Sequence, residues 1–76
     1  MMINKSVVSD RLRELRKSKG YTQKELANLL SVSYEGVNNW EREKTLPKHE
    51  ILARLASLYQ VSIDYILGQT NTRQRY

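Results

Sequence analysis

Polar or amphipathic side chains that can form hydrogen bonds stand close together at Tyr34, Glu35, Asn38 and Asn39. Their spacing places them on one face of a short helix, where they could recognise a partner by hydrogen bonds. One histidine, no cysteine and three scattered glycines provide no catalytic triad, thiolate metal site or phosphate-cradling loop. We therefore predict a binding protein and not an enzyme, with no cofactor, metal or small-molecule ligand.

The charge of the chain is compatible with a polyanionic partner. The formal net charge is +5, which allows attraction to a polyanion, although a merely soluble basic protein would have the same balance. No apolar stretch approaches the roughly 20 residues that a membrane span needs, and no secretory signal is apparent. Together with the absence of cysteine, this leads us to expect a cytoplasmic protein that does not enter a membrane.

Start and stop signals divide the first half of the chain into helices. An apolar stripe at helical spacing predicts a first helix, which Ser6 or Ser9 could cap and Gly20 could end in a left-handed turn. Thr22 and Glu25 form the sequence pattern of a capping box, which predicts a second helix immediately afterwards. Ser33 can cap a third helix that reaches about Glu43.

The second half continues in the same way. Pro47 marks a loop before a fourth helix, and Ser62 with Asp64 opens a short fifth helix that Gly68 closes. We predict one all-α domain over residues 6–68 without strands or an internal repeat, followed by a polar tail, 69–76, that we expect to be poorly ordered. The expected core comprises Leu12, Leu15, Leu26, Leu30, Val37, Trp40, Ile51, Leu55, Leu58 and Ile66.

The segments that surround the second and third helices have a combined pattern that is specific, although each part alone is weak. They resemble the lambda-repressor and Cro type of helix-turn-helix regulators, also called the xenobiotic-response-element family. The resemblance covers about residues 6–68. It is carried by 11–16, 20–27, 32–33, 40–42, Pro47, 61–64 and 67–68.

This resemblance implies a compact five-helix domain that binds double-stranded DNA and regulates transcription, as a repressor of bacterial or prophage type. The third helix would enter the major groove. Tyr34, Glu35, Asn38 and Asn39 match the family's base-reading positions. Asparagine can pair with adenine, glutamate can accept from cytosine, and tyrosine can contact a thymine methyl group or a phosphate. Glu35 could equally be a bystander, and either asparagine could be an ordinary surface residue.

The resemblance also assigns positions outside the third helix. It implies an ion pair between Arg16 and Glu41, and a homodimer on a palindromic operator. The surplus of apolar residues in the fifth helix nominates its region as the dimer surface, at Ile63, Tyr65 and Leu67. The expected DNA-backbone contacts are Arg16, Thr22, Gln23, Ser33, Arg42, Lys44 and Lys48. A different function for the same fold is a protein-interaction module, such as an antitoxin.

Four positions depart from the family pattern. Ser31 and Glu43 stand where glycine commonly ends a helix, which implies left-handed backbone at a cost of about 1 kcal/mol. Lys48 replaces a common capping serine, so the fourth helix should begin weakly. Gly36 lies inside the third helix, where it costs about 1 kcal/mol relative to alanine.

Overall fold

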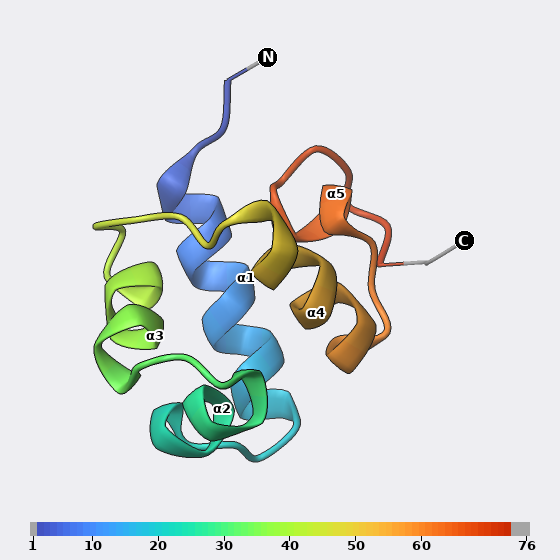
Figure 1. The fold of residues 1–76 in the computed structure, drawn as a ribbon. Coiled ribbons are helices and arrows are strands. Elements are labelled where there is room, and N and C mark those ends of the chain that lie inside the picture. The colour runs from blue at the N-terminus through green and yellow to red at the C-terminus, as the bar shows by residue number, and fades with distance from the viewer. Residues whose placement is uncertain (1, 74–76) are drawn as a thin grey trace.

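The computed structural model of the chain describes residues 2–73 and folds them into five helices (Figure 1). Within these residues there is no strand, which confirms the predicted all-α class. No helix is both long enough and apolar enough to cross a membrane within the same residues. The helices are α1 (Lys5–Ser18), α2 (Gln23–Leu30), α3 (Tyr34–Glu41), α4 (His49–Tyr59) and α5 (Ile63–Ile66).

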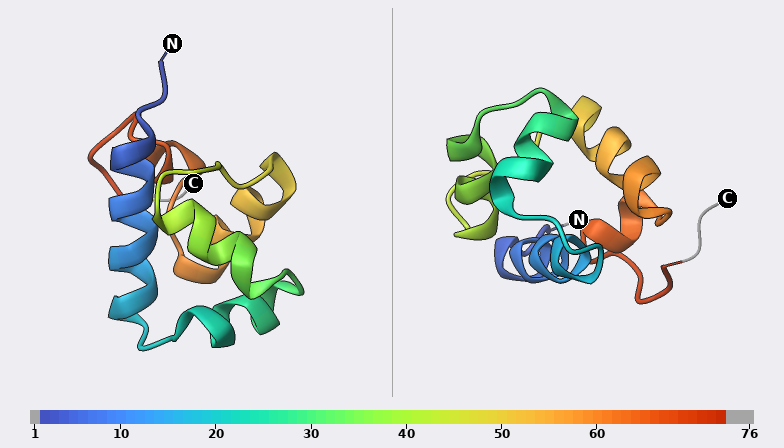
Figure 2. Two further views of the ribbon diagram at one scale, coloured as in Figure 1. Left: turned by 90° about the vertical axis from the view of Figure 1, so that its left-hand side faces the viewer. Right: turned by 90° about the horizontal axis from the view of Figure 1, so that it is seen from below.

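Helix α1 is the central support of the fold. It packs against α3 on one side and α5 on the other, while α2 packs on α3 and α4 on α5. In Figure 2 the upright α1 runs beside α3, and α2 crosses beneath them. The buried apolar side chains form a single core that comprises Val8, Leu12, Leu15, Leu26, Ala27, Leu30, Val37, Trp40, Leu52, Leu55, Ala56, Tyr59, Val61, Tyr65 and Ile66.

Two residues of the expected core lie at its edge instead. Ile51 and Leu58 are only half-buried, although both pack against the core. The reason is the rotation of α4, which turns Leu52, Ala56 and Tyr59 inward together with Leu55. With apolar residues on so many positions of α4, the sequence pattern did not define which side of that helix is buried.

The helix starts follow local hydrogen bonding. The Thr22 hydroxyl and the Glu25 carboxylate form the predicted capping box, and Ser33 and Ser62 cap α3 and α5. The predicted cap of α1 is wrong: the Asn4 side chain accepts from the N–H of Ser6, and α1 begins at Lys5. No side chain caps α4 at Lys48, which agrees with the weak start expected there.

Helix pairs α2–α3 and α4–α5 share one turn geometry, although the sequence analysis found no internal repeat. The first helix of each pair ends in left-handed backbone, at Ser31 with φ 55° and at Gln60 with φ 57°. A valine follows in both turns, and its N–H donates at 3.0 Å to the carbonyl of an alanine in the preceding helix. A serine then caps the next helix. Residues 26–37 and 55–66 are therefore a structural repeat.

The segment after α5 does not extend away from the domain. Residues 69–73 lie against α1 and α5, and Arg11 of α1 fixes them by donating to the carbonyl of Thr70 at 2.7 Å and to the side chain of Asn71 at 2.8 Å. The carbonyl of Arg73 accepts from the N–H of Ser62 at 3.3 Å. The first part of the expected tail, 69–73, thus contacts the domain, and its last residues, 74–76, lie outside the described residues.

Candidate nucleic-acid interface

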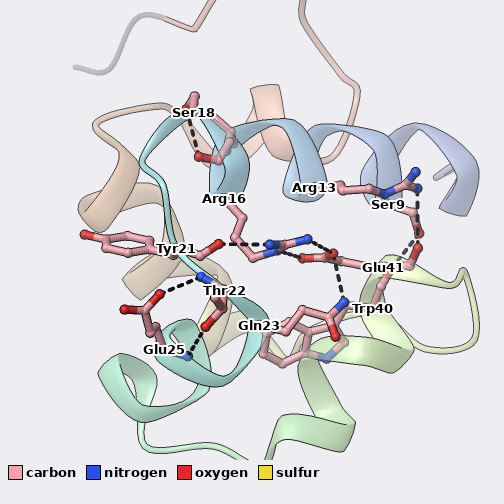
Figure 3. A network of polar contacts seen from close by, with 11 residues as sticks. Ser9, Arg13, Arg16, Ser18, Tyr21, Thr22, Gln23, Glu25, Trp40 and Glu41 are labelled. Atoms are coloured by element: carbon pink, nitrogen blue, oxygen red, sulfur yellow. Dashed lines mark hydrogen bonds and ion pairs between the residues drawn. The ribbon is translucent and has the colours of Figure 1, made fainter.

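A buried ion pair connects the first and third helices. The guanidinium of Arg16 donates through Nε to Glu41 Oε2 at 2.7 Å and through a terminal nitrogen to Oε1 at 2.9 Å (Figure 3). The two side chains are only 12% and 4% exposed. The hydrogen bond to the Glu41 carboxylate raises the pKa of Arg16, so its guanidinium stays charged. The sequence expectation of this ion pair agrees with the geometry.

The same carboxylate also holds the start of α2. Gln23 Nε2 donates to Glu41 Oε1 at 3.1 Å, and the remaining terminal nitrogen of Arg16 donates to the carbonyl of Tyr21 at 2.9 Å. Figure 3 shows these contacts as one continuous network between α1, α2 and α3. The network fixes the start of α2 relative to the end of α3, and sequence reasoning missed the link between Gln23 and Glu41.

This arrangement limits one expected DNA contact. Arg16 uses three of its five N–H groups inside the protein, and its side chain is 12% exposed, so little of the guanidinium is accessible to a phosphate. Tyr59 lies against the same network, and its buried hydroxyl has no hydrogen-bond partner within residues 2–73. Burial, assisted by the charge of Glu41, raises the pKa of Tyr59 well above its usual range.

The expected base-reading residues lie on the accessible side of α3. Tyr34 is 49% exposed, Glu35 is exposed, and Asn38 and Asn39 are half-buried. Within residues 2–73 none of these four side chains makes a hydrogen bond or an ion pair, so their donors and acceptors are available to a partner. Val37 and Trp40 occupy the opposite face and are buried in the core. Helix α3 is therefore packed on the core through one face and exposes a polar face on the other.

The expected phosphate contacts surround this face at the two ends of the motif. Thr22 and Ser33 are exposed and accept backbone N–H groups as caps, which leaves each hydroxyl hydrogen free to donate. Arg42, Lys44 and Lys48 are exposed in and after the loop behind α3. This loop also contains Glu43, whose φ of 64° is the left-handed conformation expected there.

A further cation lies near the polar face, and the sequence analysis did not consider it. The ammonium of Lys24 lies 6.0 Å from the centre of the Tyr34 ring, at the outer limit of a cation–π contact. Lys24 is exposed on the first turn of α2. Because the contact joins the second helix to the third, only the three-dimensional arrangement reveals it.

The expected dimer surface needs one correction. Tyr65 is buried at 6% exposure, because the guanidinium of Arg11 covers its ring at 4.2 Å and Arg73 stacks at 5.4 Å. Its hydroxyl also accepts from Arg73 Nε at 3.2 Å. Ile63 and Leu67 are half-buried and remain partly accessible. The accessible apolar side chains in this region are therefore Ile63 and Leu67 and not Tyr65.

The fold and the exposed α3 define a small helical domain of the helix-turn-helix class. The sequence profile of the helix-turn-helix family matches residues 12–66. The chain belongs to this family.

Curated relatives share the domain over most of this chain. The regulator ImmR of Bacillus subtilis is 40% identical over 65 residues, which cover 86% of this chain and 51% of ImmR. Repressor protein C2 of Salmonella phage P22 is 34% identical over 91% of this chain and 34% of its own length. The transcriptional activator BcrR of Enterococcus faecalis is 36% identical over 79% of this chain and 29% of its own length. The chain spans about half the length of ImmR.

Proposed function

We propose that this chain is a cytoplasmic transcriptional regulator that binds double-stranded DNA sequence-specifically with α3 in the major groove. The observation that carries the proposal is the polar face of α3, whose side chains have free hydrogen-bonding groups while the opposite face is buried. An α-helix fits the major groove, where each base pair presents a distinct pattern of donors and acceptors. The names of the relatives include both a repressor and an activator, so the proposal concerns regulation and not its direction.

Backbone contacts would come from the residues around this face. Arg42, Lys44 and Lys48 supply positive charge, and the hydroxyls of Thr22 and Ser33 supply donors. Gln23 has one Nε2 hydrogen committed to Glu41 and a second one available to a phosphate. We expect these contacts to set the position of the domain on the duplex without selecting its sequence.

We further propose that the protein binds as a homodimer on a palindromic operator. One α3 of eight residues reads few bases, and two copies on half-sites about 34 Å apart would extend the recognised sequence. Ile63 and Leu67 offer apolar surface for such a pair. Selection of bound sites from random duplexes should therefore return palindromes that hold two subunits. One subunit on a site without symmetry would exclude this arrangement.

The proposal is tested by separating sequence reading from backbone binding. We expect Asn39→Ala to reduce discrimination between the selected site and random DNA by about 1–3 kcal/mol, because one bidentate base contact is lost. Lys44→Ala should weaken both duplexes equally and lower the slope of log affinity against log salt by about 0.9, because one counterion fewer is released. Gln23→Ala should change the slope little, because its side chain is neutral, but it also removes the hydrogen bond to Glu41 and therefore does not test a backbone contact alone.

Titrations at several salt concentrations give all of these values. Equal and weak binding of the parent protein to both duplexes would overturn the proposed function and favour a protein-interaction module. An unchanged specificity ratio for Asn39→Ala would remove that residue from the base-reading set.

A further inference from the structure

The C-terminal end of α3 is held by side chains of α1. A helix leaves its last carbonyl groups without partners in the helix, and a helix of eight residues depends on tertiary contacts for its stability. Ser9 Oγ donates to the carbonyl of Trp40 at 2.6 Å. Arg13 donates to the carbonyl of Glu41 at 3.4 Å, and Arg16 pairs with the Glu41 carboxylate. Figure 3 shows the three donors along one side of α1, facing the end of α3.

Ser9 differs from Arg13 in its burial. Arg13 is 40% exposed at its side chain and also pairs with Asp10, so solvent and a second partner compete for its guanidinium. Ser9 is 1% exposed, and its hydroxyl is the partner of the Trp40 carbonyl within residues 2–73. Without this hydroxyl, a buried carbonyl would have to move to find another donor or water. Ser9 is therefore a buried contact among those that hold the last turn of α3.

We infer that Ser9 is a positioning residue for DNA reading, which acts by fixing the tilt of α3 and touches no base itself. This inference rests on the proposed function. Eight residues of helix span about 12 Å, so a tilt of about 5° at the Trp40 end would displace the Tyr34 end by about 1 Å. A displacement of that size is enough to weaken hydrogen bonds to base edges, which tolerate a narrow range of distances.

A positioning role and a merely stabilising role predict different results. A variant that is only less stable has fewer folded molecules, and it loses affinity for every duplex by the same factor. A variant with a displaced α3 loses affinity for the selected site and largely keeps its affinity for random DNA, because backbone contacts dominate nonspecific binding. The ratio of the two affinities therefore separates the two roles.

The experiment compares Ser9→Ala with Ser9→Cys and Ser18→Ala in the full chain. Ser18 is a control for the loss of a serine hydroxyl from α1: its hydroxyl also donates to a carbonyl, that of Leu15 at 2.8 Å, but it is exposed and the contact stays within α1. We expect Ser9→Ala to lower the specificity ratio about three- to tenfold, because a displaced α3 weakens part of its hydrogen bonding to base edges. Ser9→Cys, with a weaker and larger donor that cannot keep the 2.6 Å contact, should also lower the ratio, and Ser18→Ala should match the parent.

Amide hydrogen exchange of the free protein provides a readout that needs no DNA. Ser9→Ala should speed exchange in the last turn of α3 relative to α4, whereas Ser18→Ala should leave this ratio unchanged. A parent that does not discriminate between duplexes would overturn the proposed function, even if exchange showed the anchor at Ser9. An unchanged specificity ratio in both Ser9 variants, in a parent that does discriminate, would overturn the inference alone. If Ser9→Ala does not fold, Ser9→Cys decides between these results.

Discussion

Substitution of Glu41 by alanine should strongly destabilise the domain. The change removes the acceptor of two Arg16 donors and one Gln23 donor, at a site where both charged side chains are nearly excluded from water. Loss of one partner of a buried ion pair costs about 3–5 kcal/mol. Arg16 keeps its bond to the Tyr21 carbonyl and is 12% exposed, so its freed guanidinium can recover some hydration. We therefore expect a loss of about 3 kcal/mol.

Urea unfolding at equilibrium measures this loss. Trp40 is the single tryptophan and lies in the core next to Glu41, so its fluorescence should report the transition, with circular dichroism as a second probe. The matched control is Asp10→Ala, which breaks the exposed pair with Arg13 and should cost less than about 1 kcal/mol. The double variant Arg16→Met with Glu41→Leu removes both charges and should be more stable than Glu41→Ala. A loss below about 1 kcal/mol for Glu41→Ala would refute the reasoning.

Two further predictions concern α4. Tyr59→Phe removes a buried hydroxyl that has no partner within residues 2–73, so it should raise stability by about 1 kcal/mol at neutral pH. Folding raises the pKa of Tyr59 above the 10.0 of the unfolded chain. The free energy of unfolding of the parent is therefore unaffected by this group below pH 10, and it falls as the pH rises further, because only the unfolded chain loses the phenol proton readily. Stability curves from pH 7 to 11 should therefore show a steeper alkaline loss in the parent than in Tyr59→Phe, and parallel curves would contradict this. Gln60→Gly should stabilise by about 0.5–1 kcal/mol in thermal or urea unfolding, because φ is 57° at that exposed position. Asn28→Gly, in the helical interior of α2, should lose a similar amount, and equal losses in both variants would show that the strain at Gln60 is absent.

Features that depend on neighbouring residues could be predicted from the sequence. Thr22 and Glu25 cap α2 as expected, because the donors and acceptors of a capping box lie within one turn. Left-handed backbone at Ser31 and Glu43 was expected because the resembled family commonly has glycine at both positions. Gln60, with the same conformation, was missed, because the repeat between the two helix pairs was recognised only once their turns could be compared.

Features that depend on distant residues could not be derived from local patterns. Ser9 was considered as a helix cap, but its hydroxyl serves a carbonyl 31 positions away in α3. Its position next to the buried Val8 was the sequence signal that could have indicated a buried serine on α1. Tyr65 was counted as surplus apolar surface, because nothing in the sequence of α5 indicates that Arg11 and Arg73 cover its ring. The exposed face of α3 was predicted because the resemblance supplied the crossing of α2 and α3.

The repeated helix pairs bear on how the chain folds. Each pair closes within one short stretch of sequence, 23–41 or 49–66, so most of its contacts form at small loop-closure cost. Helix α1 then packs against α3 of one pair and α5 of the other. Low contact order of this kind favours rapid folding. Because each helix pair forms locally, the packing of α1 against both pairs is the step that joins them into one cooperative unit.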